Sequence, residues 1–166
     1  RPQEEVGTLM DLFVKAIDRE VDELVANGVS LRFIGDRSAF APALRDRMTR
    51  AEQKHPAQIR LQLNIATNYG GRWDVVQAMR KICGAVSRGE IDEARLDEAV
   101  FDAHTCLADL PPLDLFIRTG GEHRVSNFLL WQLAYAELWF SDVLWPDFDA
   151  TTLDQALADY ARRQRR

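Results

Sequence analysis

The sequence predicts an α/β protein with a mostly parallel central sheet flanked by helices. Four apolar runs of strand length alternate with segments of helical character, and such alternation is typical of parallel sheets. A chain of 166 residues with 46% hydrophobic and 28% charged residues is long enough for one domain with a sizeable core. We therefore expect residues 1–166 to form a single domain.

The first predicted helix begins near Pro2 and ends before Gly28. Its apolar residues recur at three- and four-residue steps, which place them on one face of a helix: Val6, Leu9, Phe13, Ile17, Val21 and Leu24. The next run, Val29–Ile34 (VSLRFI), predicts a short strand, and Ala43–Lys54 predicts a charged surface helix.

The second predicted strand, Ile59–Ala66, has one strongly apolar face made by Ile59, Leu61, Leu63 and Ile65. Its end is the turn Asn68–Asp74, which contains Gly70, Gly71 and Arg72 and opens a helix over Trp73–Ser87. Two interpretations of this turn have equal weight. It is either a tight strand-to-helix connection, with Asp74 favourable in the first helical turn, or part of the functional site.

The second half of the chain continues the alternation. The segments are a polar helix over Glu93–Cys106, a strand in Leu113–Ile117 (LDLFI), a turn of helix in Phe128–Leu133, a strand over Ala136–Phe140, a loop over Leu144–Phe148 and a last helix over Leu153–Arg163.

The loop after the LDLFI strand has the composition of an anion site. In Arg118–Gln132 (RTGGEHRVSNFLLWQ), Arg118 and Arg124 offer guanidinium groups and Ser126 offers a hydroxyl. Gly120–Gly121 would let backbone amides approach a ligand. The alternative is a Gly-Gly turn with both arginines in surface ion pairs. Because two strands end in Gly-Gly beside an arginine, we expect both loops at the same edge of the sheet.

Glu137 lies within the apolar run WQLAYAELWF, where a carboxylate is unlikely to be buried without a partner. The partner is either an arginine such as Arg118 or Arg124, or Mg²⁺, which takes one or two protein carboxylates beside water and phosphate oxygens. His123 could assist, but a lone loop histidine is more often solvated, so it is not among the candidate site residues.

Composition excludes several classes of protein. A formal charge of -5 argues against a general nucleic-acid binder, so we expect no nucleic-acid partner. Cys83 and Cys106 lack metal-ligand spacing and suit a reducing cytoplasm. We find no signal peptide and no membrane-spanning apolar run, and we expect a soluble protein. Because Arg1 and Pro2 open the chain without an initiator Met, we expect it to begin inside a longer protein.

Three stretches together identify a family: Asp114–Phe148, Asn64–Asp74 (NIATNYGGRWD) and the opening RPQEEV. They closely resemble the bacterial cis-prenyltransferases, undecaprenyl diphosphate synthases in particular, and the resemblance covers essentially the whole chain. The resemblance implies the following site residues: Arg118, Arg124 and Ser126, with the Val125 backbone between them, for the diphosphate of isopentenyl diphosphate; Glu137 for a Mg²⁺ site; and Arg1 for the allylic diphosphate.

The same resemblance implies an activity. The family condenses isopentenyl diphosphate onto farnesyl diphosphate to make undecaprenyl diphosphate, the lipid carrier precursor for cell-wall polysaccharide. It implies a homodimer in the cytoplasm, with a peripheral association at the inner face of the plasma membrane through the lipid product. Leu61, Leu63 and Ile65 are a candidate wall for a product tunnel, although core packing explains them equally well.

The sequence departs from the family pattern at its beginning. The family's Asp-Gly-Asn-Gly-Arg-Trp-Ala loop and Ser-Glu-Asn-Trp segment do not occur in it. We therefore expect the carboxyl-terminal part of the enzyme, with the catalytic aspartate and asparagine before residue 1 and no turnover by this part alone. Two alternatives remain: a non-catalytic partner subunit of the same fold, which the complete reading frame would reveal, and an unrelated phosphate-binding α/β module, which a titration of isopentenyl diphosphate against other phosphates would reveal.

Overall fold

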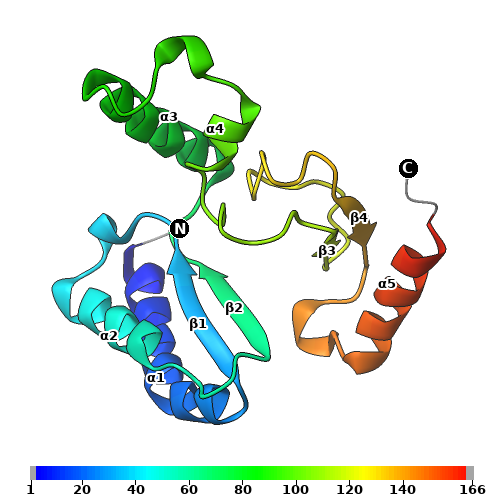
Figure 1. Ribbon diagram of the computed structural model, residues 1–166. Helices are drawn as coiled ribbons and strands as arrows, with labels where there is room; N and C mark the ends of the chain where they lie inside the picture. The colour runs from blue at the N-terminus through cyan, green and yellow to red at the C-terminus, as the bar shows by residue number, and fades with distance from the viewer. Residues whose placement is uncertain (1–2, 164–166) are drawn as a thin grey trace. The chain divides into compact units, whose positions relative to one another are not determined.

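The computed structural model describes residues 3–163, except for the side chains of residues 3–11, 14, 15 and 18. The chain forms two compact units, one ending at Tyr69 and the other beginning at Gly70 (Figure 1). Among the described residues, no helix is both long enough and apolar enough to cross a membrane. The prediction of a single domain over residues 1–166 stays a prediction.

The first unit is built on a parallel strand pair. Strand β1 (Val29–Ile34) pairs in parallel with β2 (Leu61–Ala66), and Leu31 lies opposite Leu63 in the register. Helices α1 (Gln3–Ala26) and α2 (Pro42–Gln53) contact β1 and each other (Figure 1). Proline suits the start of α2 because the first helical position leaves its amide without an intrahelical partner.

The core of the first unit joins α1, β1 and α2. Its buried members are Ile17, Val21, Leu31, Phe33, Leu44, Met48 and Ala51. Of the predicted apolar face of β2, Leu63 and Ile65 pack against this core, whereas Leu61 is 58% exposed. Leu61 is therefore outside the core of the first unit, and its reading as a tunnel wall stays a prediction.

The second unit contains the other parallel pair. Strand β3 (Leu115–Arg118) lies beside β4 (Glu137–Phe140), preceded by helices α3 (Gly71–Ser87) and α4 (Glu98–Asp102) and followed by α5 (Ala150–Arg162). Asp149 caps α5, since its carboxylate accepts the Thr152 N–H at 2.8 Å. All four predicted strands are present and both pairings are parallel, which confirms the α/β class.

The predicted helix over Glu93–Cys106 is wrong. The structure has a 3₁₀ turn at Glu93–Arg95 and then the five-residue α4. The reason is local capping: Asp92 accepts the Ala94 N–H and Asp97 accepts the Val100 N–H, so two short elements begin where one was expected. The turn of helix expected in Phe128–Leu133 is a run of turns with one helical bond, from Leu133 N–H to the Leu129 carbonyl.

Candidate functional site

The candidate site begins where β3 ends. In the register of the pair, Arg118 lies beside Phe140 at the carboxyl ends of the strands, and Leu115 lies beside Glu137 at their amino ends. The loop that follows β3 is thus at the edge of a parallel pair where α/β proteins bind ligands.

Three of the predicted site residues converge in this loop. Arg118 Nη1 donates to Ser126 Oγ at 2.7 Å and to the Arg124 carbonyl at 2.5 Å. Arg124 Nε donates to the same Ser126 Oγ at 3.1 Å. Two guanidinium groups therefore share one hydroxyl, which concentrates positive charge and hydrogen-bond donors in a small volume. Val125 lies between them, and its carbonyl accepts the Phe128 N–H.

Part of the alternative reading also holds. Arg124 forms an ion pair with Glu122, and their side chains are 65% and 42% exposed. An exposed pair of this kind contributes at most about 1 kcal/mol, so an incoming diphosphate would compete with it at little cost. Arg118 has no such acidic partner among the described residues.

The two glycines of the loop serve the backbone rather than a ligand. Gly120 and Gly121 have φ of 84° and 73°, a conformation that other residues adopt at a cost. Their N–H groups donate to the carbonyls of Val143 and Ser141 at 2.8 and 3.0 Å. The expectation that these amides approach a ligand is therefore wrong, because the chain after β4 already uses them.

The turn at Gly70–Arg72 contacts the site loop, although the strands before the two Gly-Gly sequences, β2 and β3, belong to different strand pairs. Asn127 accepts the Gly71 N–H through its carbonyl at 2.6 Å and the Arg72 N–H through its side chain at 2.9 Å. A Cβ built on Gly71 would lie 2.7 Å from Leu130, so only glycine fits there. Sequence analysis missed Asn127; the signal was a Ser-Asn pair, since asparagine tolerates left-handed turns.

Asp74 is 2% exposed and lies in the first turn of α3. Its contacts are structural, in line with the interpretation of Asn68–Asp74 as a tight connection. Its carboxylate accepts the Cys106 N–H at 2.8 Å and the Gln132 side-chain amide at 2.9 Å. Gln132 also donates to the Cys106 carbonyl. This network holds the end of the site loop to α3, and no pattern in the sequence indicates that Gln132 would reach Asp74.

Glu137 has a cationic partner, although neither Arg118 nor Arg124. Arg163 Nη1 donates to Glu137 Oε2 at 2.7 Å. This hydrogen bond, followed by one to Asp159, raises the pKa of the Arg163 guanidinium above its ordinary value. The contact uses one of the two carboxylate oxygens of Glu137. Among the side chains that the structure describes, no three His, Cys, Asp or Glu residues gather into a metal site.

Two further expectations concern single residues. The His123 ring packs on Phe140 with 5.1 Å between the ring centroids, so it covers the end of β4. Arg1, expected at the allylic diphosphate, lies outside the described residues.

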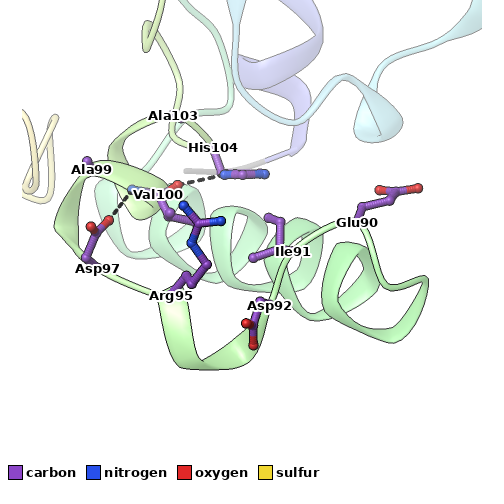
Figure 2. A pocket seen from close by; sticks show the side chains of 9 residues that line it. All are labelled: Glu90, Ile91, Asp92, Arg95, Asp97, Ala99, Val100, Ala103 and His104. Atoms are coloured by element: carbon purple, nitrogen blue, oxygen red, sulfur yellow. Dashed lines mark hydrogen bonds between the residues drawn. The ribbon is translucent and has the colours of Figure 1, made fainter.

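A separate hollow lies beside α4, and none of the predicted site residues lines it (Figure 2). His104 and Asp97 line it, but their polar atoms bind their own helix: His104 Nδ1 donates to the Val100 carbonyl and Asp97 caps the Val100 N–H.

The comparisons with known proteins agree with one another. The family model described as "Putative undecaprenyl diphosphate synthase" matches residues 1–166. A ditrans,polycis-undecaprenyl-diphosphate synthase of Xanthomonas axonopodis pv. citri is 58% identical over the whole chain, which spans 65% of that relative's length. The protein of the same name from Escherichia coli is 51% identical, and the chain spans 66% of it. Both names state specificity for (2E,6E)-farnesyl diphosphate.

Solved structures show the same fold. The lavandulyl diphosphate synthase of Lavandula x intermedia, crystallised with dimethylallyl diphosphate, is 37% identical with a TM-score of 0.93 over all of this chain and 72% of its own. A probable undecaprenyl diphosphate synthase from Campylobacter jejuni is 30% identical with a TM-score of 0.87, covering all of this chain and 77% of its own.

Proposed function

The chain belongs to the undecaprenyl diphosphate synthase family, and on that premise we propose that its protein condenses isopentenyl diphosphate onto farnesyl diphosphate to make undecaprenyl diphosphate. The names of its relatives support this allylic substrate. The activity is proposed for the complete protein, since the chain spans 65% of the length of the first of these relatives.

The observation that carries the proposal is the convergence of Arg118, Arg124 and Ser126. Arg118 Nη1 and Arg124 Nε both donate to Ser126 Oγ, at 2.7 and 3.1 Å. A guanidinium fork matches two oxygens of a diphosphate, and the serine hydroxyl can donate to a third. We assign isopentenyl diphosphate to this loop, with the Val125 backbone between the two polar side chains.

In the proposed reaction these residues bind and orient. They hold the diphosphate so that the double bond of isopentenyl diphosphate lies against the allylic carbon of farnesyl diphosphate. A carbon–carbon bond then forms, the allylic carbon–oxygen bond breaks, diphosphate leaves and one proton is lost. Such orientation lowers the activation barrier of the reaction, because the two substrates lose their translational and rotational entropy when they bind and not in the chemical step.

We propose Mg²⁺ as the cofactor and Glu137 as one of its ligands. When bound, the ion would neutralise charge on diphosphate oxygens. A single carboxylate is compatible with Mg²⁺, which keeps water and phosphate oxygens around it. Glu137 also serves Arg163, however, and it lies at the end of β4 opposite to Phe140, the neighbour of Arg118. A test of the metal role therefore has to separate it from the ion pair with Arg163.

Assembly and location are part of the same proposal. We propose a homodimer in the cytoplasm whose long hydrocarbon product brings it to the inner face of the plasma membrane. Its product would serve as the lipid carrier precursor for cell-wall polysaccharide. The support is membership of the family together with the apolar nature of the proposed product.

The test is an assay of the complete protein. Purified protein is incubated with labelled isopentenyl diphosphate, Mg²⁺ and either farnesyl or dimethylallyl diphosphate, and the products are separated by chain length. We expect a long polyprenyl diphosphate from farnesyl diphosphate and none after chelation of Mg²⁺. Binding of isopentenyl diphosphate without turnover would instead indicate a non-catalytic partner subunit. Equal binding of unrelated phosphates would indicate a general phosphate-binding module.

A further inference from the structure

We propose that Asn127 is a positioning residue for isopentenyl diphosphate, because it fixes the turn that carries Ser126 to the first turn of α3. The inference rests on the proposed function of the Arg118–Ser126 loop. Asn127 is not assigned to contact the substrate. It acts through its neighbour Ser126, whose hydroxyl receives hydrogen bonds from both arginines.

The first support is the way in which α3 begins. Gly70 is its N-cap residue and has no side chain to accept a hydrogen bond. Asn127 takes over this role from 55 positions along the chain, since its Oδ1 accepts the Arg72 N–H at 2.9 Å and its carbonyl accepts the Gly71 N–H at 2.6 Å. Two of the N–H groups that a helix leaves unpaired at its start are thus satisfied by a single residue of the site loop.

The fit between the two segments is close. A Cβ built on Gly70 would lie 2.7 Å from Asn127 Nδ2. The side chain of Asn127 therefore occupies the space that a larger residue at position 70 would need. The site loop cannot shift along α3 without losing both hydrogen bonds.

The second support is the backbone of the turn itself. Ser126 and Asn127 both have positive φ, 47° and 63°, a conformation that residues with a Cβ adopt at a cost and that asparagine tolerates better than most. Such a turn persists where its surroundings hold it. The contacts of Asn127 with α3 provide that hold, and they keep Ser126 Oγ where Arg118 and Arg124 meet.

The positive end of the α3 dipole points towards the same turn. Helix N-termini favour nearby anions. Because Asn127 already accepts the Gly71 and Arg72 N–H groups, we assign the helix an electrostatic contribution and no direct hydrogen bond from these two groups to the diphosphate.

The experiment compares Asn127→Ala and Asn127→Gly in the complete protein. Alanine removes the side-chain acceptor of the Arg72 N–H and the tolerance of positive φ, whereas glycine removes that acceptor alone. Both variants keep the main-chain carbonyl that accepts the Gly71 N–H. We expect both variants to raise KM for isopentenyl diphosphate about fivefold or more, the factor that corresponds to loss of one capping interaction. KM for farnesyl diphosphate should stay at the wild-type value, because the variants displace only the Ser126 turn.

The matched control is Asp97→Ala, which removes the side-chain cap of α4 far from the proposed loop in sequence. It should lower the melting temperature and leave KM for isopentenyl diphosphate unchanged. If the Asn127 variants behave like this control, Asn127 is a helix cap only and the inference is overturned. If glycine restores wild-type KM while alanine does not, backbone conformation alone matters and the role of the cap is overturned. A wild-type protein that neither binds nor condenses isopentenyl diphosphate would overturn the proposed function as well.

Discussion

Arg163 and Glu137 form an ion pair with 2.7 Å between Nη1 and Oε2, so the end of α5 is tied to the start of β4. Arg163 also donates to the Leu138 carbonyl and to Asp159. The carboxylate in the apolar strand run therefore has its counterion at Arg163, the residue directly after α5. Any metal role of Glu137 has to coexist with this contact.

Glu137→Gln in the complete protein tests whether Glu137 binds Mg²⁺ in addition to its ion pair with Arg163. Glutamine keeps the shape of the side chain but removes the charge, so Mg²⁺ would bind more weakly. We expect lower turnover and a higher Mg²⁺ concentration for half-maximal activity. Arg163→Met is the matched variant, since it breaks the ion pair and leaves the carboxylate. Equal Mg²⁺ dependence in wild type and Glu137→Gln would assign Glu137 to the ion pair alone.

The contact between Arg163 and Asp159 predicts a pH dependence. The hydrogen bond from Arg163 lowers the pKa of the Asp159 carboxyl below its ordinary value. A carboxyl with a lower pKa in the folded protein contributes stability that is fully present above its unfolded pKa, about 4, and is lost as pH falls through the folded pKa. We expect the melting temperature to fall with acidification in that range, and to fall less in Asp159→Asn. Parallel curves for the two proteins would contradict this.

Substitution of Leu61 distinguishes its two possible roles, a residue of the product-tunnel wall and a residue of the core. It is 58% exposed within the structure, whereas Leu63 packs on the core of the first unit. Leu61→Ala should therefore change the free energy of unfolding by about 0.5 kcal/mol or less, and Leu63→Ala should cost clearly more. If Leu61 faces the growing product, its truncation lengthens the products seen by chromatography. An unaltered product distribution would reject the tunnel assignment.

Gly35 is predicted to resist substitution. It has a φ of 117°, and a Cβ there would lie 2.0 Å from the Thr67 carbonyl oxygen. Gly89 is the matched control, because it has a φ of 72° but nothing within 4 Å of a built Cβ. Gly89→Ala should cost about 1–2 kcal/mol from the left-handed conformation, and Gly35→Ala more, since backbone must also move. Similar melting temperatures for both variants would contradict this account.

Much of the fold could be predicted from local sequence signals. The bounds of β1 match the prediction because Gly28 and Gly35, with φ of 82° and 117°, end the extended run on either side. Arg118, Arg124 and Ser126 could be grouped because they lie within one short loop after a strand. A loop of this length brings its own polar side chains together, as the shared Ser126 hydroxyl shows.

The missed features depend on contacts between distant positions. The bond between Asn127 and Arg72 joins residues 55 apart, and that between Glu137 and Arg163 joins residues 26 apart. Neither spacing carries a periodic signal, so residue type alone could not select the partners. The Gly120–Gly121 amides were misjudged for a similar reason, because the carbonyls that they bind come after β4.

We propose that Arg118 and Arg124 hold the diphosphate of isopentenyl diphosphate. The direct measurement is steady-state kinetics of Arg118→Ala and Arg124→Ala in the complete protein, with each substrate varied in turn. Each change removes a charge-assisted hydrogen bond of about 1.5–3 kcal/mol, so KM for isopentenyl diphosphate should rise roughly tenfold or more. Lysine at either position should rescue only partly, because it restores the charge without the fork. Normal kinetics towards isopentenyl diphosphate in both alanine variants would contradict the assignment of this loop.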